Sequence, residues 1–167
     1  TEMRRSSVRT NVIVSTVAIG ACAKGEQWAK AFELFDELQR HALRPNAVAL
    51  NRVIGAAEAG QQWSRALLLL TAAQNQHIEC NVCTYNSLIN ACSNQRHWVA
   101  ALALLEGLRS EMLRPSAVTC GTLMSACQKG HTWPSALALF TQMRADNLAF
   151  DVVSCSACIT ALVTGHR

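Results

Sequence analysis

Residues 82–116 read VCTYNSLINACSNQRHWVAALALLEGLRSEMLRPS, and this stretch holds one of the four tryptophans of the chain. The tryptophans stand at positions 28, 63, 98 and 133, so each follows the previous one by thirty-five residues. Two alanine columns keep the same step: Ala21, Ala56, Ala91, Ala126 and Ala161 form one, and Ala31, Ala66, Ala101 and Ala136 form the other. A fixed period of this length indicates an array of structural repeats.

Each repeat is predicted to contain two helices. In the second repeat apolar side chains recur at helical spacing over residues 47–59 and again over 64–76. Gly25, Gly60 and Gly130 lie between the two segments, where glycine commonly ends a helix. Pro134 directly follows a tryptophan, and the first turn of a helix tolerates proline. We therefore expect an all-α fold.

The repeat boundaries follow from the prolines. Pro45 and Pro115 stand just before two boundaries, where proline blocks helix continuation. Neither end of the sequence coincides with a repeat boundary, so we expect the segment to come from a longer array. The expected division is the end of a preceding repeat at 1–11, full repeats at 12–46, 47–81, 82–116 and 117–151, and the first helix of a fifth repeat at 152–167.

Composition restricts the class of protein only loosely. Half of the residues are apolar, 5% are aromatic and the net charge is +4, which suits an anionic partner but is common among ordinary domains. The apolar stretch 66–70, like every other in the sequence, is far shorter than the roughly twenty residues that cross a bilayer, so no membrane insertion is expected.

The cysteines and histidines predict neither a metal site nor a catalytic centre. The pairs Cys80 with Cys83 and Cys155 with Cys158 have ligand-like spacing, but they lie more than two repeats apart and cannot share one tetrahedral metal. Buried, reduced thiols are expected instead. Because no nucleophile is paired with any of the five histidines, we expect no enzyme activity and no cofactor.

The repeat resembles the pentatricopeptide repeat family in its TYNSLI start at 84–89, its ALALL second helix at 101–105 and its LRP end at 113–115. The tetratricopeptide family is the competing interpretation, but its repeat places tryptophan early, whereas here tryptophan opens the second helix. The resemblance covers essentially the whole chain. It implies a right-handed α-solenoid that binds single-stranded RNA along its first helices, one base per repeat, in a mitochondrion or plastid.

In that family the fifth and last residues of a repeat address the Watson–Crick edge of a base. The family's code then implies adenine for the first pair, a pyrimidine leaning to cytosine for the second and third, and weakly guanine for the fourth, roughly A-C-C-G from the 5′ end. The pairs are Thr16 with Asn46, Asn51 with Asn81, Asn86 with Ser116, and Gly121 with Asp151, and Ser156 would begin a fifth.

Two further columns complete the site that the resemblance implies. The second residues would sandwich the bases, and Cys83 departs from the branched aliphatic side chains of the others, which are Ile13, Val48, Val118 and Val153. Lys24 and Lys129 would contact phosphates, although Ala59 and Asn94 replace them in the middle repeats.

Structural roles offer an alternative for most of these residues. The last-residue column precedes each first helix and consists of good helix caps. The aliphatic column could equally belong to the core, and the lysines could complement the negative end of a helix. Asn51 and Asn86 are the strongest candidates, because asparagine inside a helix costs several tenths of a kcal/mol relative to alanine.

A second function stays open beside RNA binding. The array could be a scaffold subunit of a large organellar ribonucleoprotein or protein complex, for example a ribosome. Gly121, Cys83 and the incomplete lysine column favour this interpretation, because a sequence-specific binder gains from keeping every pocket intact. Catalysis would require a further domain beyond Arg167.

Overall fold

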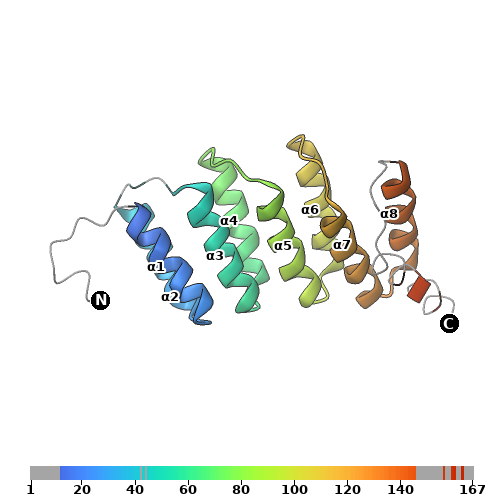
Figure 1. Cartoon of the computed structure of the whole chain (residues 1–167), viewed down its shortest axis with the longest axis horizontal. Helices are drawn as coiled ribbons and strands as arrows, with labels where there is room; N and C mark the ends of the chain where they lie inside the picture. The colour runs from blue at the N-terminus through green and yellow to red at the C-terminus, as the bar shows by residue number, and fades with distance from the viewer. Residues whose placement is uncertain are drawn as a thin grey trace. The chain divides into compact units, whose positions relative to one another are not determined.

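The computed structural model describes residues 12–41, 43, 45–145, 156, 159, 160 and 163. Within these residues the chain forms eight helices of thirteen residues each and no strand, so it has the all-α helical repeat fold that the sequence predicts (Figure 1). The helices are α1 (Val12–Lys24), α2 (Trp28–Arg40), α3 (Ala47–Ala59), α4 (Trp63–Asn75), α5 (Val82–Asn94), α6 (Trp98–Ser110), α7 (Ala117–Lys129) and α8 (Trp133–Ala145).

The helix starts follow the period of the sequence. The first helices begin at Val12, Ala47, Val82 and Ala117, the positions where the repeats are expected to begin. The second helix of the second repeat begins one residue earlier than predicted, at Trp63. The reason is that the carbonyl of Gln62 already accepts the amide of Ala66 at 3.0 Å, so helical hydrogen bonding starts with Gln62 and Trp63 is the first helical residue.

Glycine directly follows three of the first helices, α1, α3 and α7, as expected. Gly60 and Gly130 follow α3 and α7 with φ of −82° and −87°, and the residues in the left-handed region are the next ones, Gln61 and His131. A Cβ on Gly60 would collide with the ring of Trp28, and one on Gly130 with Trp98. The glycines therefore make room for the tryptophan of the preceding repeat.

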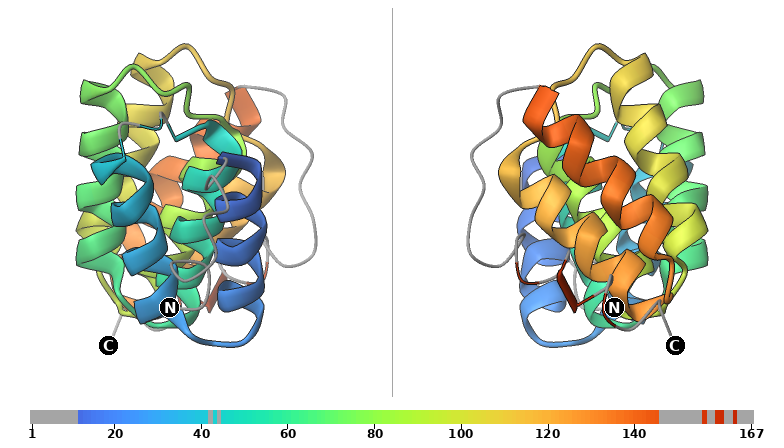
Figure 2. Two further views of the ribbon diagram at one scale, coloured as in Figure 1. Left: turned by 90° about the vertical axis from the view of Figure 1, so that its left-hand side faces the viewer. Right: turned by 90° about the vertical axis from the view of Figure 1, so that its right-hand side faces the viewer.

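The helices gather into two compact units, Thr1–Cys80 and Asn81–Arg167. In the N-terminal unit α3 packs against α1, α2 and α4, and α1 also packs against α2. In Figure 2, α1 and α3 form one layer of this unit and α2 and α4 the other. Its largest fully buried side chains are Ile19, Phe35, Leu38, Leu50 and Ile54.

The C-terminal unit repeats this arrangement, with α5 packed on α6 and α7, and α7 packed on α6 and α8. Tyr85 is fully buried and its hydroxyl donates to Glu111 Oε1 at 3.2 Å. A cluster of Cys120, Met124 and Met143 joins α7 to α8. In both units the close approach of the helices depends on small side chains. The alanines of the second column are fully buried. In the first column Ala56, Ala91 and Ala126 have at most 2% of their surface accessible. Ala21 is exposed, because no described helix precedes α1.

Cys80, Cys92, Cys120 and Cys127 are buried, as expected, whereas Cys22 is half-buried and Cys83 is exposed. Burial raises the pKa of the Cys92 thiol to about 11 and also raises that of Cys127. Cys155 and Cys158 lie outside the described residues. No described helix has both the length and the apolarity needed to span a membrane.

Candidate nucleic-acid interface

The second-residue column of the first helices is exposed. Ile13, Val48 and Val118 leave 68%, 52% and 67% of their surface accessible, and Cys83 on α5 is exposed as well. Burying an aliphatic side chain is favourable by about 1.5–3 kcal/mol, so a core role would have hidden them. The interpretation of this column as core is therefore wrong for these residues. Val153 lies outside the described residues.

The last-residue column does cap the first helices. Asn46 Oδ1 accepts the amide of Ala49 at 2.8 Å, and Asn81 Oδ1 accepts that of Thr84 at 3.0 Å. Ser116 caps α7 in the same way. Capping occupies the oxygen of each asparagine and does not use its amide N–H groups, which are donors on exposed side chains. Capping and base contact are thus compatible at Asn46 and Asn81. Asp151 lies outside the described residues.

The fifth residue of the first repeat differs from its expected geometry. Thr16 is buried, with 6% of its surface accessible, and its hydroxyl donates to the carbonyl of Val12 at 2.6 Å. The single hydroxyl proton is therefore used within α1. In this arrangement Thr16 offers no free donor to a base.

Asn86 lies at the junction of α5 and α7. Its Oδ1 accepts the hydroxyl of Thr119 at 2.6 Å. Thr119 Oγ1 also accepts the amide of Ser116 at 3.0 Å, and the Thr119 and Ser116 hydroxyls lie 2.9 Å apart. Because the Thr119 proton goes to Asn86, Ser116 is the donor between the two hydroxyls. The structure thus joins the fifth and last residues of the third repeat, Asn86 and Ser116, through Thr119.

Sequence reasoning missed Thr119. The signal that could have found it is the position of this threonine three residues after the cap, the spacing of a capping box. Asn51 is half-buried on α3, Gly121 is half-buried on α7, and Ser156 is exposed in a helical segment.

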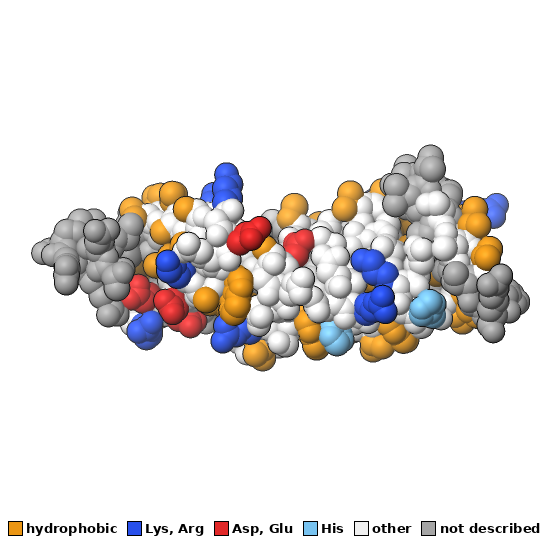
Figure 3. All heavy atoms as spheres, turned by 90° about the horizontal axis from the view of Figure 1, so that it is seen from below, with side chains coloured by type: hydrophobic (Ala, Val, Ile, Leu, Met, Phe, Trp, Pro, Cys, Tyr) orange, Lys and Arg blue, Asp and Glu red, His pale blue; other side chains and the backbone are white. Residues whose placement is uncertain are grey.

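Charge on the first helices is mainly positive. Lys24 and Lys129 are exposed at the ends of α1 and α7, as are Ala59 and Asn94 at the equivalent positions. The helices α1, α5 and α7 contain no Asp or Glu, and α3 contains only Glu58. Seen from below, acidic and basic side chains mix toward the N-terminal end, whereas the charged side chains visible toward the C-terminal end are basic or histidine (Figure 3).

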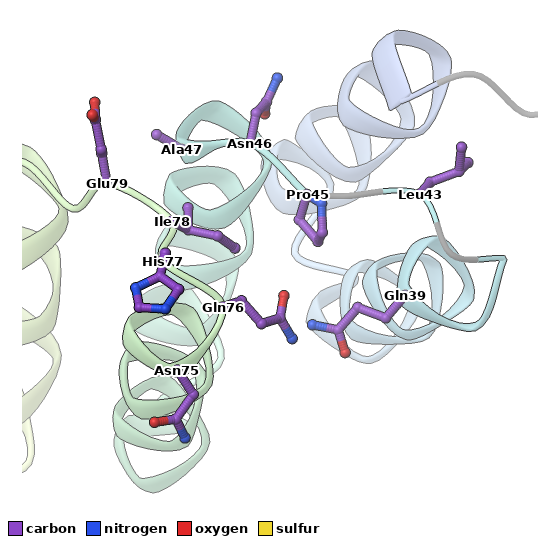
Figure 4. Close-up of a pocket in the computed structure, with 10 residues that line it drawn as sticks. All are labelled: Gln39, Leu43, Pro45, Asn46, Ala47, Asn75, Gln76, His77, Ile78 and Glu79. Atoms are coloured by element: carbon purple, nitrogen blue, oxygen red, sulfur yellow. The ribbon is translucent and has the colours of Figure 1, made fainter.

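A cavity of about 710 Å³ lies within the N-terminal unit, where α2 and α4 end and α3 begins. Pro45 and Ile78 supply apolar surface, and the side-chain amides of Gln39 and Gln76 point toward one another (Figure 4). His77 is the only imidazole in its lining. Among the described residues no three His, Cys, Asp or Glu side chains gather in a way that could hold a metal ion.

Comparison with known proteins places the chain in a class of helical repeat proteins. Residues 13–42 match the PPR repeat and residues 80–129 match the PPR repeat family. No curated protein sequence matches the chain.

Two solved structures agree. The pentatricopeptide repeat protein PPR10 in complex with an 18-nt psaJ RNA element is 25% identical, with a TM-score of 0.78 over 94% of this chain and 23% of that one. The PPR domain of Arabidopsis thaliana protein-only RNase P 1, in complex with tRNA, is 12% identical, with a TM-score of 0.84 over 97% of this chain and 86% of that domain. The latter shows the fold alone. The chain thus contains pentatricopeptide repeats, at residues 13–42 and 80–129, and it spans 23% of the length of PPR10.

Proposed function

We propose that the chain binds single-stranded RNA along the exposed side of its first helices, one base per repeat. The observation that carries the proposal is the exposed aliphatic column Ile13, Val48 and Val118 on helices almost free of carboxylates. These branched side chains recur at a fixed spacing and keep at least half of their surface accessible. They are suited to lie against the faces of unstacked bases. The RNA in the PPR10 complex is in keeping with this proposal.

The polar side chains beside this column would select the base. In the third repeat the Thr119 hydroxyl occupies Asn86 Oδ1, so Asn86 would address a base through its amide N–H donors. Such donors suit the acceptors of a pyrimidine, in keeping with the expected A-C-C-G site. The first repeat would discriminate least, because the Thr16 proton is used within α1.

The chain's contribution would be occupancy of RNA and not turnover. At about 1–3 kcal/mol per correctly read base, four repeats specify a site that occurs roughly once per few hundred nucleotides. Bound RNA would be shielded from nucleases or held open for another protein. The organelle, a mitochondrion or plastid, is proposed on family resemblance alone.

A scaffold role is the second candidate. Exposed apolar side chains on the second helices and after them favour it, since 69% of Leu68, 62% of Val99 and 90% of Met112 are accessible. These residues lie away from the first-helix column and could contact other proteins of an organellar complex.

The test is a titration of the chain with labelled RNAs that contain ACCG, AUCG or GUUA, at several salt concentrations. We expect ACCG to bind most tightly. Asn86→Ala should lose about 1–3 kcal/mol of the preference for ACCG over GUUA, which differ at the third base, while Asn75→Ala, an exposed asparagine on α4, should not. Equal affinity for all three RNAs would contradict base reading, and no binding to any would favour the scaffold.

A further inference from the structure

We infer that Arg52 is a phosphate-binding residue of the N-terminal unit, in a role that the repeat pattern assigns to no residue of the second repeat. This inference rests on the proposed RNA binding and specifies where the backbone is held. Position 59, where the pattern would place the lysine of that repeat, is alanine. Arg52 lies seven residues earlier on the same exposed side of α3.

The position of Arg52 follows from helical geometry. Val48, Arg52 and Ala59 are all exposed, and their separations of four and seven residues put them on one side of α3. Val48 belongs to the proposed base-sandwiching column. A base held against Val48 would therefore have its backbone within reach of the long Arg52 side chain.

Gly20 holds the guanidinium in place. The Arg52 side chain crosses from α3 onto α1, and a Cβ built on Gly20 would coincide with the guanidinium and lie 3.2 Å from Cδ. Any larger residue at position 20 would push the arginine away. At Gly55, the equivalent position on α3, nothing lies within 4 Å of a Cβ, so no side chain occupies that site.

The part of the chain that the structure describes offers Arg52 no partner of opposite charge. Among the described residues no carboxylate forms an ion pair with Arg52, and α1, on which it lies, contains no Asp or Glu. Glu58, the one acid of α3, is six residues away, about 240° around the helix. Lys24 stands one turn beyond Gly20, about 6 Å along α1. Arg52 and Lys24 therefore form a short basic track beside the aliphatic column.

The chemistry of this track fits phosphate. A planar guanidinium donates two parallel hydrogen bonds to phosphate oxygens and stays charged at any physiological pH. Because it lies over Gly20, the Arg52 side chain has less rotamer freedom to lose on binding. Contact with phosphate carries no base preference, so Arg52 would add affinity to every sequence equally.

The experiment measures RNA affinity against salt for the whole chain and for Arg52→Gln. We expect the slope of log K against log salt to fall by about 0.7, the change for one phosphate contact to a single strand, and affinity for ACCG and GUUA to fall by the same factor. Arg65→Gln is the matched control. It removes the same charge from the same unit, but Arg65 lies on α4, 5.9 Å from the Trp28 ring and 5.3 Å from that of Phe32.

Two further variants separate the possible outcomes. Lys24→Gln should lower the slope as Arg52→Gln does, and Gly20→Ala should lower affinity with the charge kept, its folding checked by circular dichroism. If Lys24→Gln has its effect but Arg52→Gln behaves like Arg65→Gln, the inference about Arg52 is wrong. A loss that depends on the base, with the slope unchanged, would show stacking and also overturn it. If the unaltered chain binds no RNA, the proposed function itself fails.

Discussion

Within each unit equivalent helices pack on one another, but different side-chain contacts connect the first helices of the two repeats. In the C-terminal unit polar bonds link α5 to α7: Asn86 accepts from Thr119, and Ser93 donates to the carbonyl of Thr122 at 3.4 Å. At the equivalent positions the N-terminal unit has Thr16 opposite Ala49, which has no hydroxyl, and Ala23 in place of Ser93. There the side chain of Arg52 on α3 lies over Gly20 on α1 and connects the two helices instead.

This difference shows which property of a repeat is fixed and which is local. The apolar framework that builds the helix layers is shared by both units. In these two cases the fifth residue bonds to a neighbouring helix where the third residue of the following repeat is Thr119, and to its own helix where that residue is Ala49. Position in the repeat therefore does not by itself determine what a fifth-residue side chain can offer to a ligand.

The largest effect should come from the shared framework. Ile54 and Ile89 occupy the same place in α3 and α5, and both are fully buried. We expect Ile54→Ala and Ile89→Ala each to cost about 2–5 kcal/mol of unfolding free energy, because each leaves a cavity. Denaturant unfolding measures this. A cost below 1 kcal/mol for one of them would show that the two frameworks are not equivalent.

A smaller effect should separate the two glycines of the second repeat. Gly60→Ala introduces a Cβ that collides with Trp28, and we expect it to destabilise by about 1–3 kcal/mol. Gly55→Ala is the matched control, because it adds the same atom to open space within α3 and should stabilise by about 0.5–1 kcal/mol. Thermal melts of both variants give the sign directly. A stabilising Gly60→Ala would mean that the tryptophan ring yields easily.

Thr119→Val tests the polar joint of the C-terminal unit. The change keeps the shape of the side chain but removes the hydroxyl that bonds to Asn86 and completes the cap of α7. We expect a loss of about 1 kcal/mol in stability and, if RNA binds, a weaker preference for the base at the third repeat. Stability is read by denaturant unfolding and preference by competition between ACCG and an RNA altered at its third base.

The opposite change is the control in the N-terminal unit. Ala49→Thr would place a hydroxyl three residues after Asn46, where it can complete the capping box that α3 lacks. This variant should be at least as stable as the unaltered chain. If Thr119→Val leaves both stability and preference unchanged, the relay through Thr119 has no energetic role.

The sequence alone was sufficient to predict the framework, because the thirty-five-residue period and the apolar spacing within it locate both helices, to within one residue at the start of α4. It could not show that Thr16 is buried or that Arg52 lies on Gly20, because both depend on the side chain opposite in a neighbouring helix. The sequence also could not show that Val48 and Val118 are exposed, because an aliphatic residue at helical spacing is compatible with the core or the surface. Thr119 could have been found from its capping-box spacing, but not its bond to Asn86.

The smallest effect on stability should come from a single exposed thiol. Cys83 and Cys92 lie on α5, one exposed and one fully buried with a pKa raised to about 11. A neutral alkylating reagent at pH 8 should therefore modify Cys83 in the folded chain and spare Cys92 until unfolding. Modified Cys83 should change unfolding free energy by less than about 0.5 kcal/mol, as surface changes usually do.

The same thiols give a test by pH. A pKa raised by folding contributes stability below the pKa of the unfolded thiol, so the contribution of Cys92 should be lost as pH rises from about 9 toward about 11. Cys92→Val, which cannot ionise, should not lose it, and Cys83→Ser serves as the control at the exposed site. Equal alkylation rates for Cys83 and Cys92 at pH 8 would show that α5 opens readily. The difference between the two sides of this helix, on which the proposed interface depends, would then not hold in solution.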